Sequence, residues 1–380
     1  MDLEQETYDV GLVGGGLAGL ALSILLARSG YRVALFEKEK YPFHKVCGEY
    51  ISFESWNFLE DLGIPLSDWN LPVIRRLLVS APNGNHLEQD LPLGGFGLSR
   101  YRLDAFLAEL AKKAGVVFFE QTRVNDVVRE GNSFNIHHAA GLSYAKIVCG
   151  TFGKRSNLDV KWKRENHQAK KSKLDNYVGV KYHILADQPE DLIVLHNFQN
   201  GYCGLSQIED GKHCLCYLTS ADNLAKCGNS IAQMESDILR KNPFIDKIFT
   251  TANFIFRNPV TISQISFAKK DQVGNHILFV GDAAGMITPL CGNGMSMALH
   301  GAKIAFDCML PYLQGKLSRE QMEAGYSRQW HKIFAVRLRT GRVIQRFFGD
   351  ETFSNILIGT VKPYPRFFSF LVRKTHGGAF

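Results

Sequence analysis

The 380-residue sequence lacks the features that mark secreted and membrane-spanning proteins. Its eight cysteines form no CxxC pair and no metal-ligand spacing, so neither a disulfide scaffold nor a structural zinc site is expected. No apolar run reaches about 18 residues, the minimum for a transmembrane helix. The acidic start, MDLEQETYD, differs from the basic region that opens a secretory signal peptide. We therefore expect a reduced, cytoplasmic chain that binds no metal.

A strong excess of one charge is also missing, because 44 Lys and Arg against 37 Asp and Glu give a net charge of +7. Much of the excess lies in one basic run, residues 161–173, which contains a single acid, Glu165, and a single aromatic, Trp162. A nucleic-acid surface interleaves aromatics with bases or carries a recognised module. The run is therefore interpreted as a solvated loop, and no nucleic-acid partner is expected.

What the sequence does have is a strand–turn–helix–strand unit at its start. Residues 8–13 predict a short buried strand, residues 20–28 a helix, and residues 31–36 a second strand that ends at Glu37. Between them, Gly14–Gly19 has the pattern GxGxxG, whose glycines allow a tight turn, close approach of a pyrophosphate and close helix–strand packing. The unit predicts a dinucleotide site in which the terminal carboxylate accepts hydrogen bonds from ribose hydroxyls.

Further elements follow from periodicity and turn residues. Residues 72–92 and 177–219 alternate polar and apolar side chains and carry turns, which predicts antiparallel strands. Helices are expected at 53–62, 102–114, 231–239 and from about 316 onward, and strands at 116–119, 124–129, 133–138 and 144–149.

A second glycine-rich segment occupies residues 277–298. A predicted buried strand ends at Gly281-Asp282, and Gly292-Asn293-Gly294 then opens a helix of small residues. An aspartate at a strand end accepts hydrogen bonds from a polyol, and a glycine-rich helix start offers free N–H groups to an anion. A reduced flavin carries negative charge around N1 and the C2 carbonyl, so this helix start suits a flavin ring.

Together the two motifs resemble FAD-dependent oxidoreductases of the aromatic-hydroxylase type, the class A flavoprotein monooxygenases. Residues 42–49, PFHKVCGE, are similar to the P-x-x-K-x-C-G segment of the geranylgeranyl reductase family, and residues 100–104 match its R-x-x-L-D. The resemblance covers residues 8 to about 300. It implies an α/β fold with a Rossmann-like FAD-binding domain of the glutathione-reductase type, an inserted antiparallel-sheet substrate domain and a C-terminal helical region.

The expected domain boundaries follow from this resemblance and from the predicted elements. The FAD-binding domain is assigned residues 1–70, 100–160 and 270–315, the substrate domain residues 71–99 and 161–269, and the helical region residues 316–380.

The resemblance also implies roles for single residues. The early glycines would hold the diphosphate, Glu37 the adenosine ribose, Arg100 the phosphate–ribityl region, and Val124 the adenine through its backbone. Asp282 would bind the ribityl chain or phosphate, and Met295 would face the isoalloxazine. The full expected cofactor set is Gly14, Gly16, Leu17, Ala18, Gly19, Glu37, Lys38, Lys45, Cys47, Gly48, Arg100, Val124, Gly281, Asp282, Pro289, Gly292, Gly294 and Met295.

Two departures from the family pattern limit what the resemblance implies about the substrate. Phe152 stands where the relatives carry the acid of a G-A-D-G segment. Residues 202–207, YCGLSQ, replace the aromatic Y-x-W-x-F-P segment, so two bulky rings are lost and prenyl specificity is not transferred. Tyr202, Cys203 and Leu205 are the candidate substrate-lining residues. His183, His196 and Tyr202 lie in the same sheet, but no catalytic acid is assigned.

Several reactions remain open at this point. The P-x-x-K-x-C-G segment favours a reductase that saturates a C=C bond of an apolar isoprenoid, lipid or polyketide-like substrate. A monooxygenase that hydroxylates an aromatic or polyketide substrate is the main alternative. A halogenase, whose W-x-W-x-I-P signature is absent, and a non-catalytic flavin-binding electron-transfer protein are weaker ones.

The expected partners are an apolar or aromatic small molecule and, because only one dinucleotide fingerprint is present, NAD(P)H as a transient reductant. Residues 363–374 mix aromatics with bases, which allows either peripheral membrane contact or packing on the protein's own core. The sequence does not indicate an oligomeric state.

Overall fold

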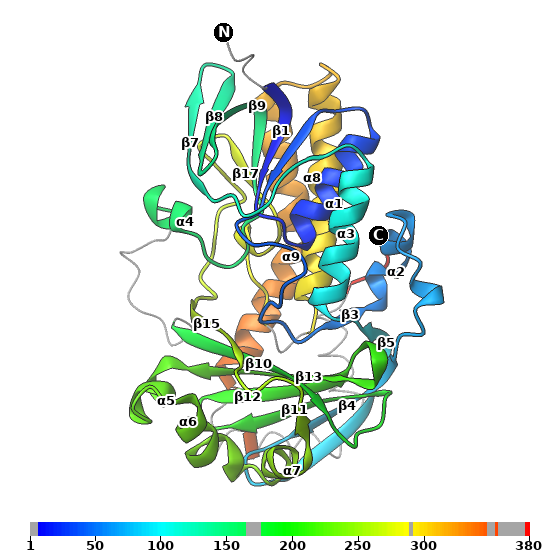
Figure 1. Cartoon of the computed structure of the whole chain (residues 1–380), viewed down its shortest axis with the longest axis vertical. Coiled ribbons are helices and arrows are strands. Elements are labelled where there is room, and N and C mark those ends of the chain that lie inside the picture. Colours follow the sequence, from blue (N-terminus) through cyan, green and yellow to red (C-terminus); the bar gives the residue numbers. More distant parts are fainter. Residues whose placement is uncertain (1–6, 165–175, 289–291, 348–353, 356–376) are drawn as a thin grey trace.

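The computed structural model describes residues 7–164, 176–288, 292–347, 354–355 and 377–380. These residues form two layers, each built on one β-sheet and stacked along the long axis of the molecule (Figure 1). The expected mixture of an α/β layer with a second sheet is confirmed.

The first sheet is mainly parallel, with the order β16-β17-β9-β1-β2-β6. Its strands are near-continuous apolar runs because both faces of the sheet are covered. A hairpin of two further strands extends it by antiparallel pairing to β9. The strands are β1 (Thr7–Val13), β2 (Val33–Phe36), β6 (Val117–Phe119), β7 (Val124–Glu130), β8 (Ser133–His138), β9 (Gly141–Gly150), β16 (Val273–Gly274) and β17 (Ile277–Phe279).

Helices α1 (Leu17–Arg28), α3 (Arg100–Lys113) and α8 (Gly294–Leu313) pack together beside this sheet (Figure 1). Helix α1 is buried on almost every side because the sheet and the two other helices surround it, which explains its uniformly apolar sequence. Helix α9 (Arg319–Phe347) packs on α8 and extends toward the second layer. A C-terminal helical region was therefore predicted correctly for the residues described.

The second sheet has the order β14-β10-β13-β12-β11-β4-β5-β3, with β15 also paired to β10. This sheet was expected to be antiparallel, but β11 and β4 pair in parallel. The two strands come from distant parts of the chain, so no hairpin forces them to run in opposite directions. The strands are β3 (Tyr50–Ser52), β4 (Val73–Ser80), β5 (His86–Gly97), β10 (Tyr177–Leu185), β11 (Leu192–Phe198), β12 (Gly201–Gln207), β13 (His213–Ser220), β14 (Asn253–Phe254) and β15 (Val260–Ile265).

Strand alternation gives the second sheet two different faces. The outer face packs a core with helices α5 (Ala221–Lys226), α6 (Ile231–Asp237) and α7 (Pro243–Thr251). In β10, Val178, Val180 and Tyr182 belong to this core. Lys181 and His183 therefore lie on the inner face, which is turned toward the first layer. Strand β3 joins this sheet although it lies within the range 1–70 predicted for the first domain.

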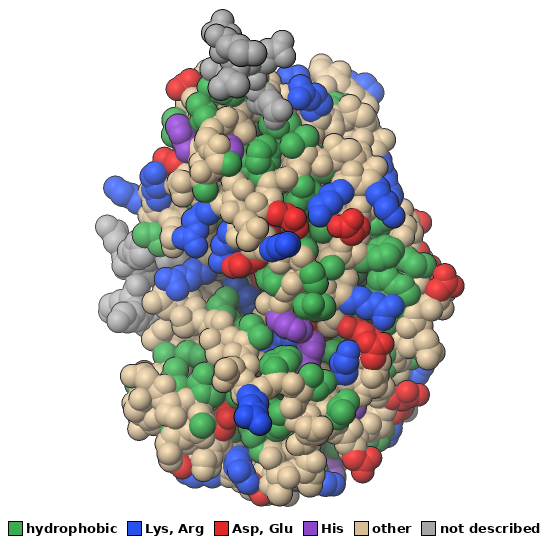
Figure 2. Space-filling view, viewed as in Figure 1, with side chains coloured by type: hydrophobic (Ala, Val, Ile, Leu, Met, Phe, Trp, Pro, Cys, Tyr) green, Lys and Arg blue, Asp and Glu red, His purple; other side chains and the backbone are tan. Residues whose placement is uncertain are grey.

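Shorter elements complete the layers: helices α2 (Trp56–Asp61) and α4 (Asn157–Lys161) and several 3-10 turns. In Figure 2, Lys and Arg side chains gather in the region where Figure 1 shows α4. Of the basic run predicted to be solvated, residues 165–175 lie outside the described part. Arg164 differs from the prediction, because its guanidinium is paired with Asp159 at 2.5 Å and lies over the Phe279 ring.

Residues 363–374, for which membrane contact was considered, are also outside the described residues. Among the helices that the structure describes, none combines the length and the apolar character needed to cross a bilayer.

Candidate functional site

The early glycine loop follows β1 and opens α1, as its sequence predicts. Gly14 has a φ of +111°, and an added Cβ there would lie 2.6 Å from the Phe152 Cα. A Cβ at Gly19 would collide with the carbonyl oxygen of Gly14. At Gly16, by contrast, an added Cβ would approach only the Arg100 guanidinium, at 3.8 Å, and one backbone carbonyl oxygen. The loop therefore leaves the backbone of Gly16 open to a ligand, which fits a diphosphate.

Glu37 directly follows β2 and lies against this loop. Its Oε2 accepts a hydrogen bond from the Gly15 N–H at 2.9 Å, and its Oε1 accepts one from the Glu39 N–H at 3.0 Å. Val124 begins the strand that follows Thr122, whose N–H donates to the Glu37 carbonyl, so it lies near the same end of the sheet. The carboxylate is thus fixed where the fingerprint predicts contact with a ribose.

Two cations beside the glycine loop share one buried acid. The Arg100 guanidinium contacts both oxygens of Asp104, at 2.6 and 2.7 Å, and the Lys45 ammonium lies 3.0 Å from the same carboxylate. Lys45 also donates to the Gly15 carbonyl at 3.3 Å. Burial would raise the pKa of Asp104, but Arg100 and Lys45 hold it below its usual value. Two positive charges against one negative charge favour an anion at this point.

The second glycine segment meets the first at the start of α1. Gly281 has a φ of +68°, and a Cβ there would lie 3.1 Å from that of Ala18. Asp282 follows in a 3-10 turn and is half-buried. Helix α8 begins at Gly294, and Met295 is buried in its first turn. The structure therefore brings together residues 281–282, the start of α8 and the early loop, while Pro289 lies outside the described residues.

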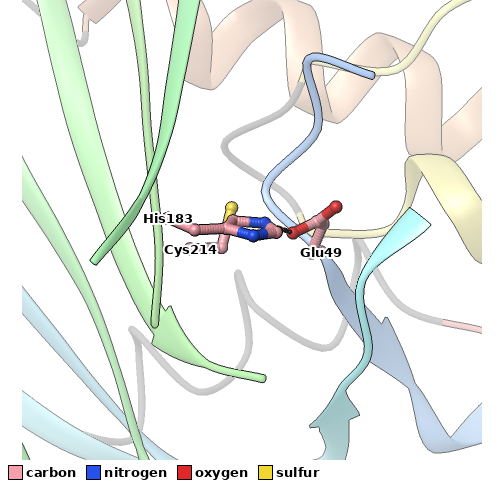
Figure 3. Close-up of side chains that lie close together, drawn as sticks. All are labelled: Glu49, His183 and Cys214. Carbon is pink, nitrogen blue, oxygen red and sulfur yellow. Dashed lines mark hydrogen bonds and ion pairs between the residues drawn. The ribbon is translucent and has the colours of Figure 1, made fainter. Parts of the chain in front are cut away.

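A buried charged cluster lies where loop 45–49 meets the inner face of the second sheet (Figure 3). The Glu49 side chain has no solvent exposure, and its Oε1 accepts from the Lys181 ammonium at 2.5 Å and from the Arg100 N–H at 2.8 Å. Its Oε2 accepts from His183 Nε2 at 2.7 Å. Burial would raise the pKa of Glu49, but Lys181 and His183 hold it below its usual value.

Glu49, His183 and Cys214 place three potential metal ligands within 4.8 Å of one another (Figure 3). The Lys181 ammonium, however, already contacts the same carboxylate and would repel a cation. Burial raises the pKa of the Cys214 thiol well above its usual value, and this thiol donates to the Cys47 carbonyl at 3.2 Å. The cluster is therefore better described as an internal ion-pair network than as a metal centre.

Another part of the inner face is apolar. Leu218 and Tyr202 are paired across β13 and β12 and pack with Ile265, Phe267 and Met286, the last of which follows the second glycine segment. The apolar face continues across the sheet through Leu195, Val79 and Leu77. We call this surface the apolar floor: Tyr202, Leu218, Leu195, Val79 and Leu77.

Comparisons with known proteins agree with this arrangement. Residues 12–65 match the model of an NAD(P)-binding Rossmann-like domain. A digeranylgeranylglycerophospholipid reductase of Methanococcus vannielii is 24% identical over 374 residues, which are 91% of this chain and 89% of that protein. Conditioned medium factor receptor 1 of Dictyostelium discoideum is 26% identical over 80% of this chain, and the match spans only 63% of the receptor.

Solved structures share the fold over nearly the whole chain. A geranylgeranyl bacteriochlorophyll reductase-like protein of Thermoplasma acidophilum is 20% identical with a TM-score of 0.78, covering 97% of this chain and 96% of that one. A flavin-dependent brominase, 18% identical, has a TM-score of 0.77 and covers 97% and 93%. A probable FAD-dependent monooxygenase of Pseudomonas aeruginosa, 16% identical, has a TM-score of 0.71 and covers 93% and 100%.

The chain is therefore similar in sequence to digeranylgeranylglycerophospholipid reductases and shares the fold of solved flavin-dependent enzymes. The residues of this chain fit FAD as a cofactor: an open backbone at Gly16, a carboxylate at Glu37 and an excess of positive charge at Arg100 and Lys45. When bound, FAD supplies the redox chemistry, and the protein supplies position and electrostatics. Lys38 contributes little to this arrangement, because its side chain is exposed and contacts only Glu39 in the structure described.

The candidate substrate-lining residues divide between the two faces of the second sheet. Tyr202 lies on the apolar floor, whereas Cys203 and Leu205 pack in the outer core with Val180 and Tyr217. The structure therefore does not bring the three side chains together, because neighbouring residues of a strand point to opposite faces.

The proton-donor candidates can also be placed. His196 lies on the outer face, where its ring stacks on Phe244 and its Nδ1 bonds Ser80 Oγ at 2.8 Å. Burial lowers the pKa of His196 to about 3, so it is neutral near pH 7 and serves packing. His183 is on the inner face but is held by Glu49 beneath loop 45–49.

Phe152, the residue in place of the acid carried by the resembled family, packs against the core of the first layer. Its ring contacts those of Phe279 and Trp162, at centroid distances of 6.1 and 6.2 Å. This side chain therefore packs just beyond the end of β9, an interior strand of the first sheet, and offers no carboxylate to a ligand.

Sequence reasoning missed Glu49, Lys181 and Asp104 as members of the site. One signal was available for Lys181: the segment YVGVKYHIL places a lysine within an otherwise apolar strand, and charged residues are almost never fully buried unless they are paired.

Proposed function

We propose that this chain is an FAD-dependent reductase that saturates a C=C bond of an apolar isoprenoid, lipid or polyketide-like substrate. The apolar floor is the observation that carries the proposal, because its side chains cover the inner face of the second sheet next to the second glycine segment. Binding there would remove apolar surface of the substrate from water. This burial contributes a favourable free energy of roughly 25 cal/mol for each Å².

The names of the relatives support the same class of reaction. The similarity to a digeranylgeranylglycerophospholipid reductase extends over most of both chains, and loop 42–49 keeps the P-x-x-K-x-C-G pattern. Gly204 and Ser206 replace two aromatic residues of the reductase segment, so the floor has lost two rings there. We therefore specify the proposed substrate only by its apolar character and do not assign it a chain length.

NAD(P)H is proposed as the reductant that visits the flavin transiently, since only one dinucleotide fingerprint is present in the sequence. An aromatic or polyketide monooxygenase is the second candidate, because solved monooxygenase and brominase structures share the fold. Trp at 56, 69, 162 and 330 leaves no W-x-W pair, which argues against halogenation.

Anaerobic turnover separates the two candidates. The purified flavoprotein is reduced with NADPH or NADH in the absence of oxygen and mixed with a polyprenyl alkene or an aromatic polyketide. We expect the flavin to be reoxidised and the alkene to gain two hydrogens, detected by mass spectrometry.

A monooxygenase would stay reduced without oxygen and would form a hydroxylated product once air is admitted. If neither substrate is converted, with or without oxygen, neither reaction is correct and a non-catalytic electron-transfer role is favoured.

A further inference from the structure

Four consecutive carbonyl groups of loop 45–49 accept hydrogen bonds from side chains outside the loop. The donors are Lys181 Nζ at 3.3 Å to Lys45, Lys154 Nζ at 3.3 Å to Val46, Cys214 Sγ at 3.2 Å to Cys47, and Ser206 Oγ at 3.4 Å to Gly48. Three of these donors project from the inner face of the second sheet. The loop is thus fastened to that sheet through its own backbone.

The opposite side of the same peptides is free. In a trans peptide the N–H points away from the carbonyl, so the N–H groups of residues 46–49 point away from the four donors. In the part of the chain that the structure describes, none of these N–H groups donates to a protein acceptor. A Cβ added at Gly48 would meet nothing within 4 Å, so the space beside it is open.

The fastening comes at an energetic cost. Lys181 and Glu49 form an ion pair without solvent exposure, and desolvation cancels much of the gain from such a pair. Glu49 also adopts a φ of +57°, a conformation that is unfavourable for a residue other than glycine. Backbone outliers of this kind gather at functional sites, where the surrounding structure holds them in place.

We propose that Lys181 and Glu49 are positioning residues for the flavin. They hold loop 45–49 on the second sheet, so that its free N–H groups are turned toward the ring and favour the reduced, negatively charged flavin over the oxidised one. Preorganised backbone donors stabilise a charge without having to reorient when it forms. The inference rests on the proposed FAD-dependent function.

The double variant Glu49→Gln/Lys181→Met tests this role. It removes one negative and one positive charge, so the net charge near the ring stays the same. A change in the midpoint potential of bound FAD therefore reports a change in the position of the loop. The matched control is Asp210→Asn/Lys212→Met, which removes an exposed ion pair of 3.1 Å at the turn before β13. The midpoint potential of bound FAD is measured by dye equilibration, and FAD affinity by fluorescence titration.

The double variant should lose at least tenfold in its preference for reduced over oxidised FAD, which makes the two-electron potential about 30 mV more negative. The control should keep the wild-type potential. Ser206→Ala removes only the hydroxyl bonded to the Gly48 carbonyl and keeps every charge. It should shift the preference about threefold, or about 15 mV, and it serves as the test if the double variant fails to fold.

Wild-type potentials in the folded, FAD-loaded variants would overturn the positioning role. A wild-type protein that takes up no FAD would instead overturn the proposed function, so the two failures are distinguishable.

Discussion

At the scale of single residues, local and distant partners differ in how well the sequence predicts them. Glu37 was predicted from its spacing to the glycine loop, because a βαβ unit of fixed length determines where its second strand ends. Its contact with the Gly15 N–H agrees with that prediction. Glu49 and Lys181 are 132 positions apart, and only the packing of the second sheet on loop 45–49 brings them together. No local pattern contains that pairing.

Replacing Glu37 by arginine should weaken FAD binding at least tenfold, or about 1.4 kcal/mol. The substitution removes the carboxylate that is expected to bind the ribose. This carboxylate also accepts a hydrogen bond from the Gly15 N–H of the glycine loop. The dissociation constant is measured by quenching of FAD fluorescence.

Glu39→Arg is the matched control. The side chain of Glu39 is 48% exposed, and this substitution changes the net charge by the same amount as Glu37→Arg. Equal dissociation constants for the two variants would contradict the role of Glu37.

At the scale of elements, strand β12 shows what periodicity predicts and what it leaves open. Its alternation establishes that Tyr202 and Cys203 point to opposite faces, but it does not tell which face meets the first layer. That choice depends on helices α5 to α7, which cover the outer face, and on Met286, which packs against the inner one. Of the three candidates on this strand, Tyr202 is the one whose side chain lies on the face turned toward the first layer.

Two substitutions in β12 should separate substrate binding from stability. Tyr202→Ala, on the apolar floor, should raise KM for an apolar substrate about tenfold, which corresponds to about 1.4 kcal/mol. Leu205→Ala, in the outer core, should lower the free energy of unfolding by about 2–5 kcal/mol and leave KM unchanged. Steady-state kinetics and urea denaturation provide the two measurements, and an unchanged KM for Tyr202→Ala would remove the floor from the substrate site.

At the scale of the whole molecule, the sequence predicted two layers and the order of most elements. It failed where pairing is non-local, as in the parallel contact of β4 with β11. It also failed at Arg164, where charge composition indicated solvent but the guanidinium lies over Phe279. Composition describes an average environment, whereas a buried partner such as Asp159 determines the position of one side chain.

FAD should stabilise the whole chain, because its expected contacts extend from the early glycine loop through loop 45–49 to the start of α8. At a concentration one hundred times its dissociation constant, a ligand that binds only the folded state adds about 2.7 kcal/mol. Differential scanning fluorimetry of the apoprotein should show Tm rising with FAD concentration.

ADP, which carries only the adenosine diphosphate half, is the control and should raise Tm less at the same concentration. Equal shifts for both compounds would indicate that the flavin half makes no net contact.

The path of the chain between the two sheets limits how this protein can be divided. The strands of the first sheet come from residues 7–36, 117–150 and 273–279, and those of the second from residues 50–97 and 177–265. No single contiguous gene fragment encodes either sheet. Exchanging the second layer with that of another protein would require transplanting both intervening stretches together, and a partial exchange would leave strands of one parent paired with strands of the other.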